Sequence, residues 1–151
     1  MLDVVVKNTE RFLLSVPKTK RKKYGQFFTN MSTAKFMASL FCFDRSKPCL
    51  EILDAGAGTG ILATAVIQKL IDDGYKGRIH VTCYETDDFV MPVLEENMRL
   101  STVLPNVTCS IKTDNYITSQ NFSTYTLFGG EDSHYDYIIG NSVTQSFSNG
   151  N

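Results

Sequence analysis

Residues 54–60 are Asp54-Ala55-Gly56-Ala57-Gly58-Thr59-Gly60, and they separate a strand-like run at 50–53 from an amphipathic run at about 59–71. The first run predicts a β-strand, and the apolar stripe of the second predicts a helix. Gly56 is expected to permit a tight turn that a side chain would obstruct. Gly58 and Gly60 are expected to let backbone approach a ligand and let the helix pack near the strand. In open parallel sheets such a loop faces the ligand crevice at the carboxyl ends of the strands.

Downstream of this loop, strand-like and helix-like segments alternate. Strands are expected at residues 79–84, 106–112 and 135–139, and a helix at 88–100, where Pro92 fits only the first turn. Such alternation predicts an α/β fold with a mainly parallel sheet covered by helices on both faces. We expect a partial doubly wound sheet, Rossmann-like, with strand order 3-2-1-4 and an N-terminal helical arm.

Upstream of the loop, the sequence predicts two helices. A short helix fits residues 1–16, with Val5, Phe12 and Leu13 on one side. A second helix is expected to be capped by Ser32 or Thr33. Its expected apolar face consists of Phe36, Met37, Leu40 and Phe41.

The predicted organisation has three parts: a basic arm at 1–23, a core at 24–141, and a disordered tail at 142–151 that is rich in Ser, Asn and Gly. The arm has seven Lys or Arg against two Asp or Glu, although the whole chain has a net charge of -1. Its basic run at 18–23 could contact nucleic-acid phosphates or could be a solvated leader.

The composition of the 151-residue chain excludes several classes of protein. With 42% hydrophobic and 21% charged residues, it is ordinary for a globular domain. Its longest apolar run, at 37–43, is too short to span a bilayer, and no signal peptide is recognisable, so a cytoplasmic protein without membrane contact is expected. Four cysteines and two histidines form no metal-binding pattern, so no metal is expected. Cys83 and Cys109 are expected to be small core residues.

The spacing of the glycines bears on the ligand. A dinucleotide-binding loop has the pattern G-x-G-x-x-G, whereas this loop has G-x-G-x-G and an acidic residue two positions before its first glycine. Asp54 would repel a pyrophosphate but would favour the sulfonium and amino groups of S-adenosylmethionine. Glu85, after the second predicted strand, can accept hydrogen bonds from ribose hydroxyls or be a polar strand end. Asp114, after the third, can accept from an adenine amino group or simply form a turn.

Three stretches make the chain resemble the N6-adenine DNA methyltransferases of restriction-modification systems. Residues 25–29, Gly-Gln-Phe-Phe-Thr, resemble the family's upstream cofactor motif, with Asn30 where proline is usual. Residues 54–60 resemble its first motif, and residues 136–141, Asp-Tyr-Ile-Ile-Gly-Asn, resemble the start of its catalytic motif. The three occur in the family's order and together cover residues 22–141.

This resemblance implies S-adenosyl-L-methionine as cofactor and DNA, with an adenine target, as partner. The upstream motif would contact the methionine end of the cofactor, the glycine loop its amino acid and ribose, Glu85 its ribose and Asp114 its adenine. The implied cofactor-binding residues are Gly25, Phe27, Phe28, Thr29, Asp54, Ala55, Gly56, Gly58, Gly60, Glu85, Thr86, Asp114 and Asn115.

The catalytic motif departs from the family. The family continues Asn-Pro-Pro-aromatic, whereas this chain has Asn141-Ser142-Val143-Thr144. In the family the Asn side chain and a proline carbonyl orient the target amino group, and the aromatic ring stacks on the flipped base. Only Asn141 keeps its place, so we expect this chain to bind cofactor weakly and to have little or no activity.

We also expect this chain to lack the family's further strands and target-recognition region, as after a frameshift or early stop. Three alternatives stay open: a non-catalytic partner-binding fragment, a methyltransferase acting on RNA or protein, and an NAD-dependent enzyme. The last is disfavoured by the glycine spacing. The free edge of the fourth predicted strand suits a homodimer.

Overall fold

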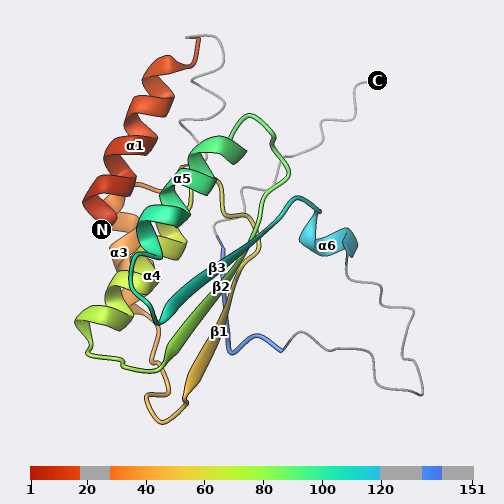
Figure 1. Ribbon diagram of the computed structural model, residues 1–151. Helices are drawn as coiled ribbons and strands as arrows, with labels where there is room; N and C mark the ends of the chain where they lie inside the picture. The colour runs from red at the N-terminus through yellow and green to blue at the C-terminus, as the bar shows by residue number, and fades with distance from the viewer. Residues whose placement is uncertain (18–27, 120–133, 141–151) are drawn as a thin grey trace.

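A computed structural model describes residues 1–17, 28–119 and 134–140 of the chain. Its centre is a parallel sheet of four strands: β1 (Cys49–Asp54), β2 (Arg78–Tyr84), β3 (Val107–Lys112) and β4 (Tyr137–Ile139). Their order is β3-β2-β1-β4, which confirms the predicted topology (Figure 1). Asp54 pairs with Cys83 on one side and with Ile139 on the other, so the strands end together at one edge.

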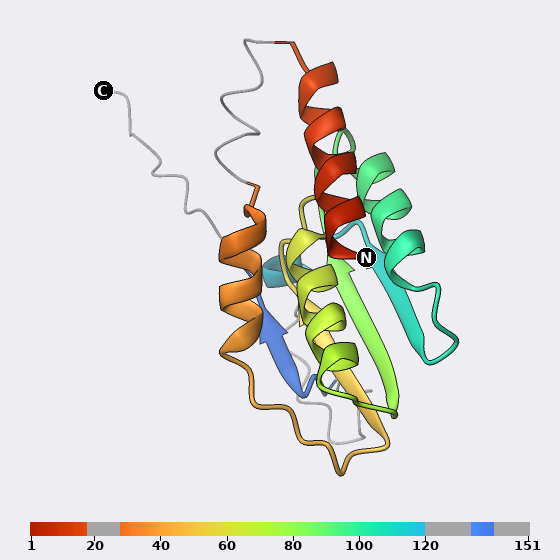
Figure 2. The ribbon, with the colours of Figure 1, turned by 90° about the vertical axis from the view of Figure 1, so that its left-hand side faces the viewer.

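Four helices lie on one face of this sheet: α1 (Leu2–Ser15), α3 (Met31–Ser39), α4 (Ile61–Asp72) and α5 (Met91–Ser101) (Figure 2). Toward the other face, the described residues add only the short helix α6 (Tyr116–Ser119), beside the carboxyl edge of the sheet (Figure 1). The expected cover of helices on both faces is therefore not seen in the described part of the chain. Helix α6 was not predicted from the sequence.

Helix α4 is the centre of the helical layer. All residues from Ile61 to Ile67 are buried, because α4 contacts α3 on one flank, α1 and α5 on the other, and the sheet beneath. A helix enclosed in this way has no need of a polar face. Leu50, Ile52 and Val81 complete the core from the sheet. Cys83 is buried in this core as expected, and Cys109 is half-buried.

Helix α1 matches the predicted segment and forms part of the buried core. Leu2, Val5 and Thr9 are buried, and the helix packs against α4 and α5. Helix α4 begins at Ile61, because Gly60 before it has a left-handed conformation. In α5, Pro92 lies in the first turn as expected.

The expected cap of α3 was wrong, and its expected apolar face was right only for Met37 and Phe41. The cap is Asn30, whose side chain accepts a hydrogen bond from the Thr33 backbone N–H at 2.8 Å. The buried residues are Ala34 and Ala38. Phe36, about 200° around the helix from Ala34, is 63% exposed. Alanines lie at the contact because their small side chains let α3 approach α4 closely. Leu40 is also exposed, whereas Met37 and Phe41 are half-buried against the core, Phe41 from beyond the end of the helix.

Several predictions fall outside the described residues: the basic run at 18–23, the tail at 142–151, and the site residues Gly25, Phe27 and Asn141. In the described part of the chain, no helix is long and apolar enough to cross a membrane.

Candidate functional site

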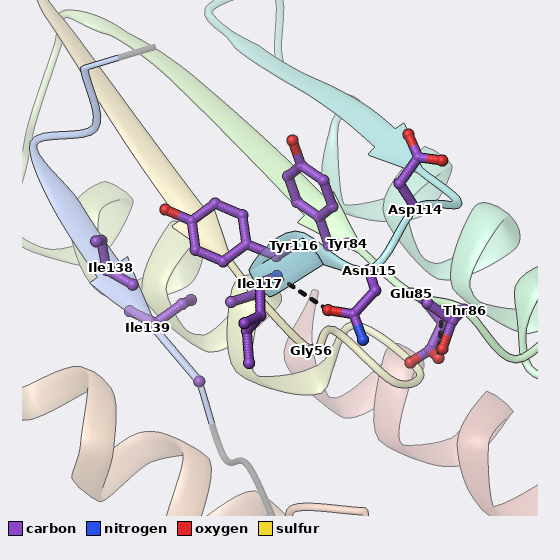
Figure 3. Close-up of a pocket in the computed structure, with 12 residues that line it drawn as sticks. Gly56, Tyr84, Glu85, Thr86, Asp114, Asn115, Tyr116, Ile117, Ile138 and Ile139 are labelled. Carbon is purple, nitrogen blue, oxygen red and sulfur yellow. Dashed lines mark hydrogen bonds between the residues drawn. The ribbon is translucent and has the colours of Figure 1, made fainter. Parts of the chain in front are cut away.

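A cavity of about 510 Å³ lies where the four strands end (Figure 3). It brings together six of the residues predicted from sequence, which come from three separate segments: Ala55, Gly56, Glu85, Thr86, Asp114 and Asn115. Six further residues complete its lining: Tyr84, Tyr116, Ile117, Ile138, Ile139 and Gly140. The predicted position of the site, at the carboxyl edge of the sheet, agrees with this geometry.

The glycine loop is held between the neighbouring strands. The Ala55 N–H donates to the Ile139 carbonyl at 3.3 Å, and the Ala57 N–H donates to the Tyr84 carbonyl at 2.9 Å. These bonds place the backbone of the loop directly over the ends of β2 and β4. The loop therefore forms one wall of the cavity.

One of the three glycines, Gly56, has a role that differs from the one expected. Gly58 and Gly60 have positive φ angles of 54° and 79°, which favour glycine, whereas Gly56 does not. A Cβ added at Gly56 would have no atom within 4 Å, so the expected obstruction at Gly56 was wrong. Gly56 instead leaves open space at the cavity wall, where a ligand can approach the backbone.

Glu85 is fixed at the edge of the cavity by three backbone N–H groups. Its Oε2 accepts from Gly58 at 2.8 Å, and its Oε1 accepts from Thr86 at 2.7 Å and from Asp87 at 2.9 Å. The carboxylate thus connects the glycine loop to the end of β2, two segments that both line the cavity (Figure 3). A carboxylate held in this way is preorganised to accept hydrogen bonds from hydroxyl groups of a ligand.

Asp114 and Asn115 follow the end of β3, on the same side of the cavity as Glu85 and Thr86 (Figure 3). Both are exposed, and Asn115 Oδ1 accepts from the Ile117 N–H at 2.9 Å, which begins α6. The Tyr84 and Tyr116 rings make an edge-on contact with centroids 5.2 Å apart. Ile117 and Ile138 expose 76% and 58% of their surface beside them, so this part of the cavity is apolar and suits a flat ring.

Sequence reasoning missed this apolar wall. Tyr84 and Ile138 offered a signal, because each stands next to a strand end that was predicted. Tyr116 and Ile117 offered none, because they belong to the unpredicted helix α6.

The described end of the upstream segment contacts the glycine loop from its other side. The Phe28 ring lies 3.4 Å from the position that a Cβ on Gly58 would take. Thr29 lines a small hollow together with Gly56, Gly58 and Thr59. Two segments that are about 30 residues apart are thus brought together.

Comparison with known proteins identifies the family. The model of the N-6 DNA methylase family matches residues 2–148, nearly the whole chain. This chain belongs to the N-6 DNA methylase family. The predicted resemblance to adenine-specific methyltransferases of restriction-modification systems is therefore confirmed.

Two curated relatives of this N-6 DNA methylase chain are type II methyltransferases. It is 33% identical to M.BsuBI of Bacillus subtilis over 115 residues, which are 75% of this chain and 23% of the relative. It is 38% identical to M.PstI of Providencia stuartii over 77 residues, which are 51% of this chain and 15% of the relative. The chain therefore spans less than a quarter of the length of these relatives.

Solved structures support the methyltransferase fold. A class I S-adenosylmethionine-dependent methyltransferase from Listeria monocytogenes aligns with a TM-score of 0.57 and 19% identity, over 92% of this chain and 38% of that one. The methyltransferase subunit of a type I restriction-modification system from Streptococcus thermophilus aligns with a TM-score of 0.53 and 19% identity, over 76% of this chain and 22% of that one. The predicted α/β, Rossmann-like fold is confirmed.

Asp54 lies beneath the glycine loop of this N-6 DNA methylase and does not line the cavity. Its side chain is buried, and neither carboxylate oxygen has a hydrogen-bond partner among the described residues. Burial raises its pKa from 3.8 to about 7, and the charge of Glu85 adds to the shift. The N–H groups of Gly56 and Ala63 oppose the shift without reaching hydrogen-bond geometry. A buried carboxylate without a partner is costly to ionise, so Asp54 favours a nearby positive charge.

Asp54 should make the ligand-free chain less stable as pH rises from 5 to 8. Between about pH 3.8 and 7 the folded chain holds a proton that the unfolded chain has released, so stability falls through this window. The total loss would be up to about 4 kcal/mol. Urea unfolding at pH 5, 6, 7 and 8 measures this loss of stability. Asp54→Asn should not show the loss and should be more stable than the wild type at pH 8. If the free energy of unfolding changes with pH in the same way in both proteins, the raised pKa of Asp54 is contradicted.

No group of three or more His, Cys, Asp or Glu that could hold a metal ion is found within residues 1–17, 28–119 and 134–140.

Proposed function

We propose that this chain binds S-adenosyl-L-methionine in the cavity at the strand ends. The observation that carries the proposal is the Glu85 carboxylate, which faces the same cavity as the open backbone at Gly56. Glu85 would accept hydrogen bonds from the ribose hydroxyls, and Gly56 would lie against the amino-acid part of the cofactor. The adenine would lie between Ile117 and Ile138, with Asp114 and Asn115 at its edge.

The residues present fit this cofactor in size and charge. The cavity volume of about 510 Å³ is within the range of ligand pockets, about 300–1,000 Å³. The buried, unpartnered carboxylate of Asp54 favours a cation above it, and the cofactor carries a sulfonium and an ammonium group. A pyrophosphate would instead bring negative charge close to Asp54 and Glu85, which disfavours NAD. Phe28 and Thr29 would close the methionine end, together with Gly25 and Phe27 from the neighbouring segment.

The reaction proposed for the whole enzyme is transfer of a methyl group to N6 of adenine in DNA. The bound cofactor supplies an electrophilic methyl group, and the protein must hold and orient the target amino group. Asn141 is the residue proposed to accept a hydrogen bond from that group. The chain has Ser142, Val143 and Thr144 where the family has two prolines and an aromatic residue. We therefore propose that this chain binds cofactor but transfers methyl groups slowly or not at all.

Calorimetric titration tests the binding. S-adenosylhomocysteine and S-adenosylmethionine should bind the purified chain with micromolar to submillimolar affinity, and NAD should give no saturable heat. The reason is the acidic lining of the site, which suits the cationic cofactor and repels a pyrophosphate. Saturable NAD binding, or a folded chain that binds none of the three, would refute the proposal.

A second candidate function is a non-catalytic fragment that binds a protein partner. The absent prolines and aromatic residue favour it, and so does β4, which among the described strands pairs only with β1. Within the described residues its other edge is unpaired, and such an edge would suit a partner strand or a second copy of the chain. Radiolabelled methyl transfer to DNA tests the non-catalytic candidate, because transfer at the rate of intact enzymes would exclude it and would also contradict the proposed loss of activity. Acceptors such as RNA or protein are disfavoured because the family whose model matches this chain is described as N-6 DNA methylase.

A further inference from the structure

Helix α1 makes a buried polar contact with the middle of the glycine loop. Thr9 on α1 and Thr59 in the loop are 2% and 1% exposed, and their hydroxyl oxygens lie 2.9 Å apart. The Thr9 hydroxyl also lies 2.9 Å from the Val5 carbonyl oxygen. Apolar residues would fill this space without hydrogen-bonding requirements, so the pairing of two hydroxyls links α1 to the loop in a specific geometry.

Helix α5 holds the same loop residue through its backbone. The Asn97 side-chain amide donates to the Thr59 carbonyl at 2.8 Å and lies 3.4 Å from the Thr9 hydroxyl. Its Oδ1 accepts from the Asn8 side chain at 3.2 Å. Asn97 is fully buried, and its amide oxygen and nitrogen are both paired. Thr59 is therefore fixed at two atoms by two helices.

The position of Thr59 makes this contact relevant to the ligand. Thr59 lies between Gly58 and Gly60, the two loop residues with positive φ. The N–H of Gly58 donates to the Glu85 carboxylate, which faces the cavity. Without its hydrogen bonds to Thr9 and Asn97, Thr59 would move more freely next to this Gly58–Glu85 hydrogen bond. The loop would then lose part of its preorganisation for a ligand.

We propose that Thr9 and Asn97 are positioning residues that hold the glycine loop in its cofactor-binding conformation, although neither touches the ligand. The inference rests on the proposed cofactor binding and extends it to helix α1. The contact acts through Thr59, so a change at Thr9 should lower cofactor affinity more than its effect on stability would suggest.

The experiment compares Thr9→Val with Thr9→Ser in the full chain. Valine has nearly the shape of threonine but leaves the Thr59 hydroxyl without this partner, whereas serine keeps the hydroxyl. We expect Thr9→Val to weaken S-adenosylhomocysteine binding about tenfold in calorimetry, the effect of one buried hydrogen bond. Thr9→Ser should stay within about twofold of the wild type, because its hydroxyl rescues the contact.

The matched control is Ile79→Val. Ile79 is fully buried near the start of β2, at the opposite end of the sheet from the loop. Removal of its methyl group should lower stability in urea unfolding to an extent similar to Thr9→Val, but leave the affinity unchanged. The inference is overturned if Thr9→Val binds as tightly as the wild type, or if Ile79→Val loses affinity equally.

Amide hydrogen exchange in the ligand-free chain separates this inference from the proposed function. The Gly58 and Gly60 amides should exchange about tenfold faster in Thr9→Val and no faster in Ile79→Val. If the wild type binds no S-adenosylhomocysteine but these amides behave as expected, the proposed function fails and the hold on the loop stands. If the Gly58 and Gly60 amides exchange at the wild-type rate in Thr9→Val, Thr9 does not stabilise the loop and the inference is refuted.

Discussion

Gly60→Ala is expected to destabilise the fold by about 2–5 kcal/mol. The φ angle of 79° at Gly60 costs a residue with a Cβ about 1–2 kcal/mol. The added Cβ would also lie 2.5 Å from the terminal methyl group of Met98 and 3.1 Å from Cδ1 of Leu94. Both side chains are buried, so neither can move away without repacking, at a further cost of about 1–3 kcal/mol. Urea unfolding measures the total.

Gly74→Ala is the control that isolates the backbone contribution. Gly74 has nearly the same φ, 78°, but a Cβ there would have no atom within 4 Å. Its substitution should cost only about 1–2 kcal/mol. Equal losses for the two variants would show that α5 does not pack against the loop as tightly as the structure indicates.

Glu85→Gln is expected to weaken S-adenosylhomocysteine binding by about 10- to 100-fold. Both carboxylate oxygens accept hydrogen bonds from backbone N–H groups, and a glutamine would turn one of those acceptors into an NH₂ donor. The backbone hydrogen bonds to one of the two side-chain oxygens would then be lost. The negative charge that makes the group a strong acceptor for ribose hydroxyls would be lost as well. Calorimetric titration gives the ratio of the dissociation constants.

Glu95→Gln is the control for net charge. Glu95 is exposed on α5 and does not line the cavity, so its substitution removes the same charge without touching the proposed site. We expect its affinity to stay within about twofold of the wild type, since exposed charges are strongly screened. If both variants bind equally well, Glu85 does not contact the cofactor.

The fold and the position of the site could be predicted from local sequence patterns, because tertiary packing did not change the elements that these patterns indicate. Each predicted strand was followed by an acid or a glycine, at Asp54, Glu85, Asp114 and Gly140. In a parallel sheet these positions meet at one edge. The position of the site and the lining residues that directly follow the strands could therefore be predicted without any knowledge of side-chain packing.

The details that depend on packing between distant segments could not be predicted. The buried face of α3 is its alanines, because close approach to α4 favours small side chains over Phe36. Nothing local in the sequence shows that Thr9 meets Thr59, 50 residues away, or that Gly60 lies against Met98. The apolar wall at Ile117 was missed because α6 is only four residues long.

Amide NMR of the chain with S-adenosylhomocysteine tests the central claim, cofactor binding at the strand ends, most directly. The account predicts saturable shifts concentrated at the amides of Gly56, Gly58, Glu85, Thr86 and Asn115, with little change near Ile79 at the far end of the sheet. Shifts centred elsewhere, or an unchanged spectrum from a folded chain at millimolar ligand, would contradict it.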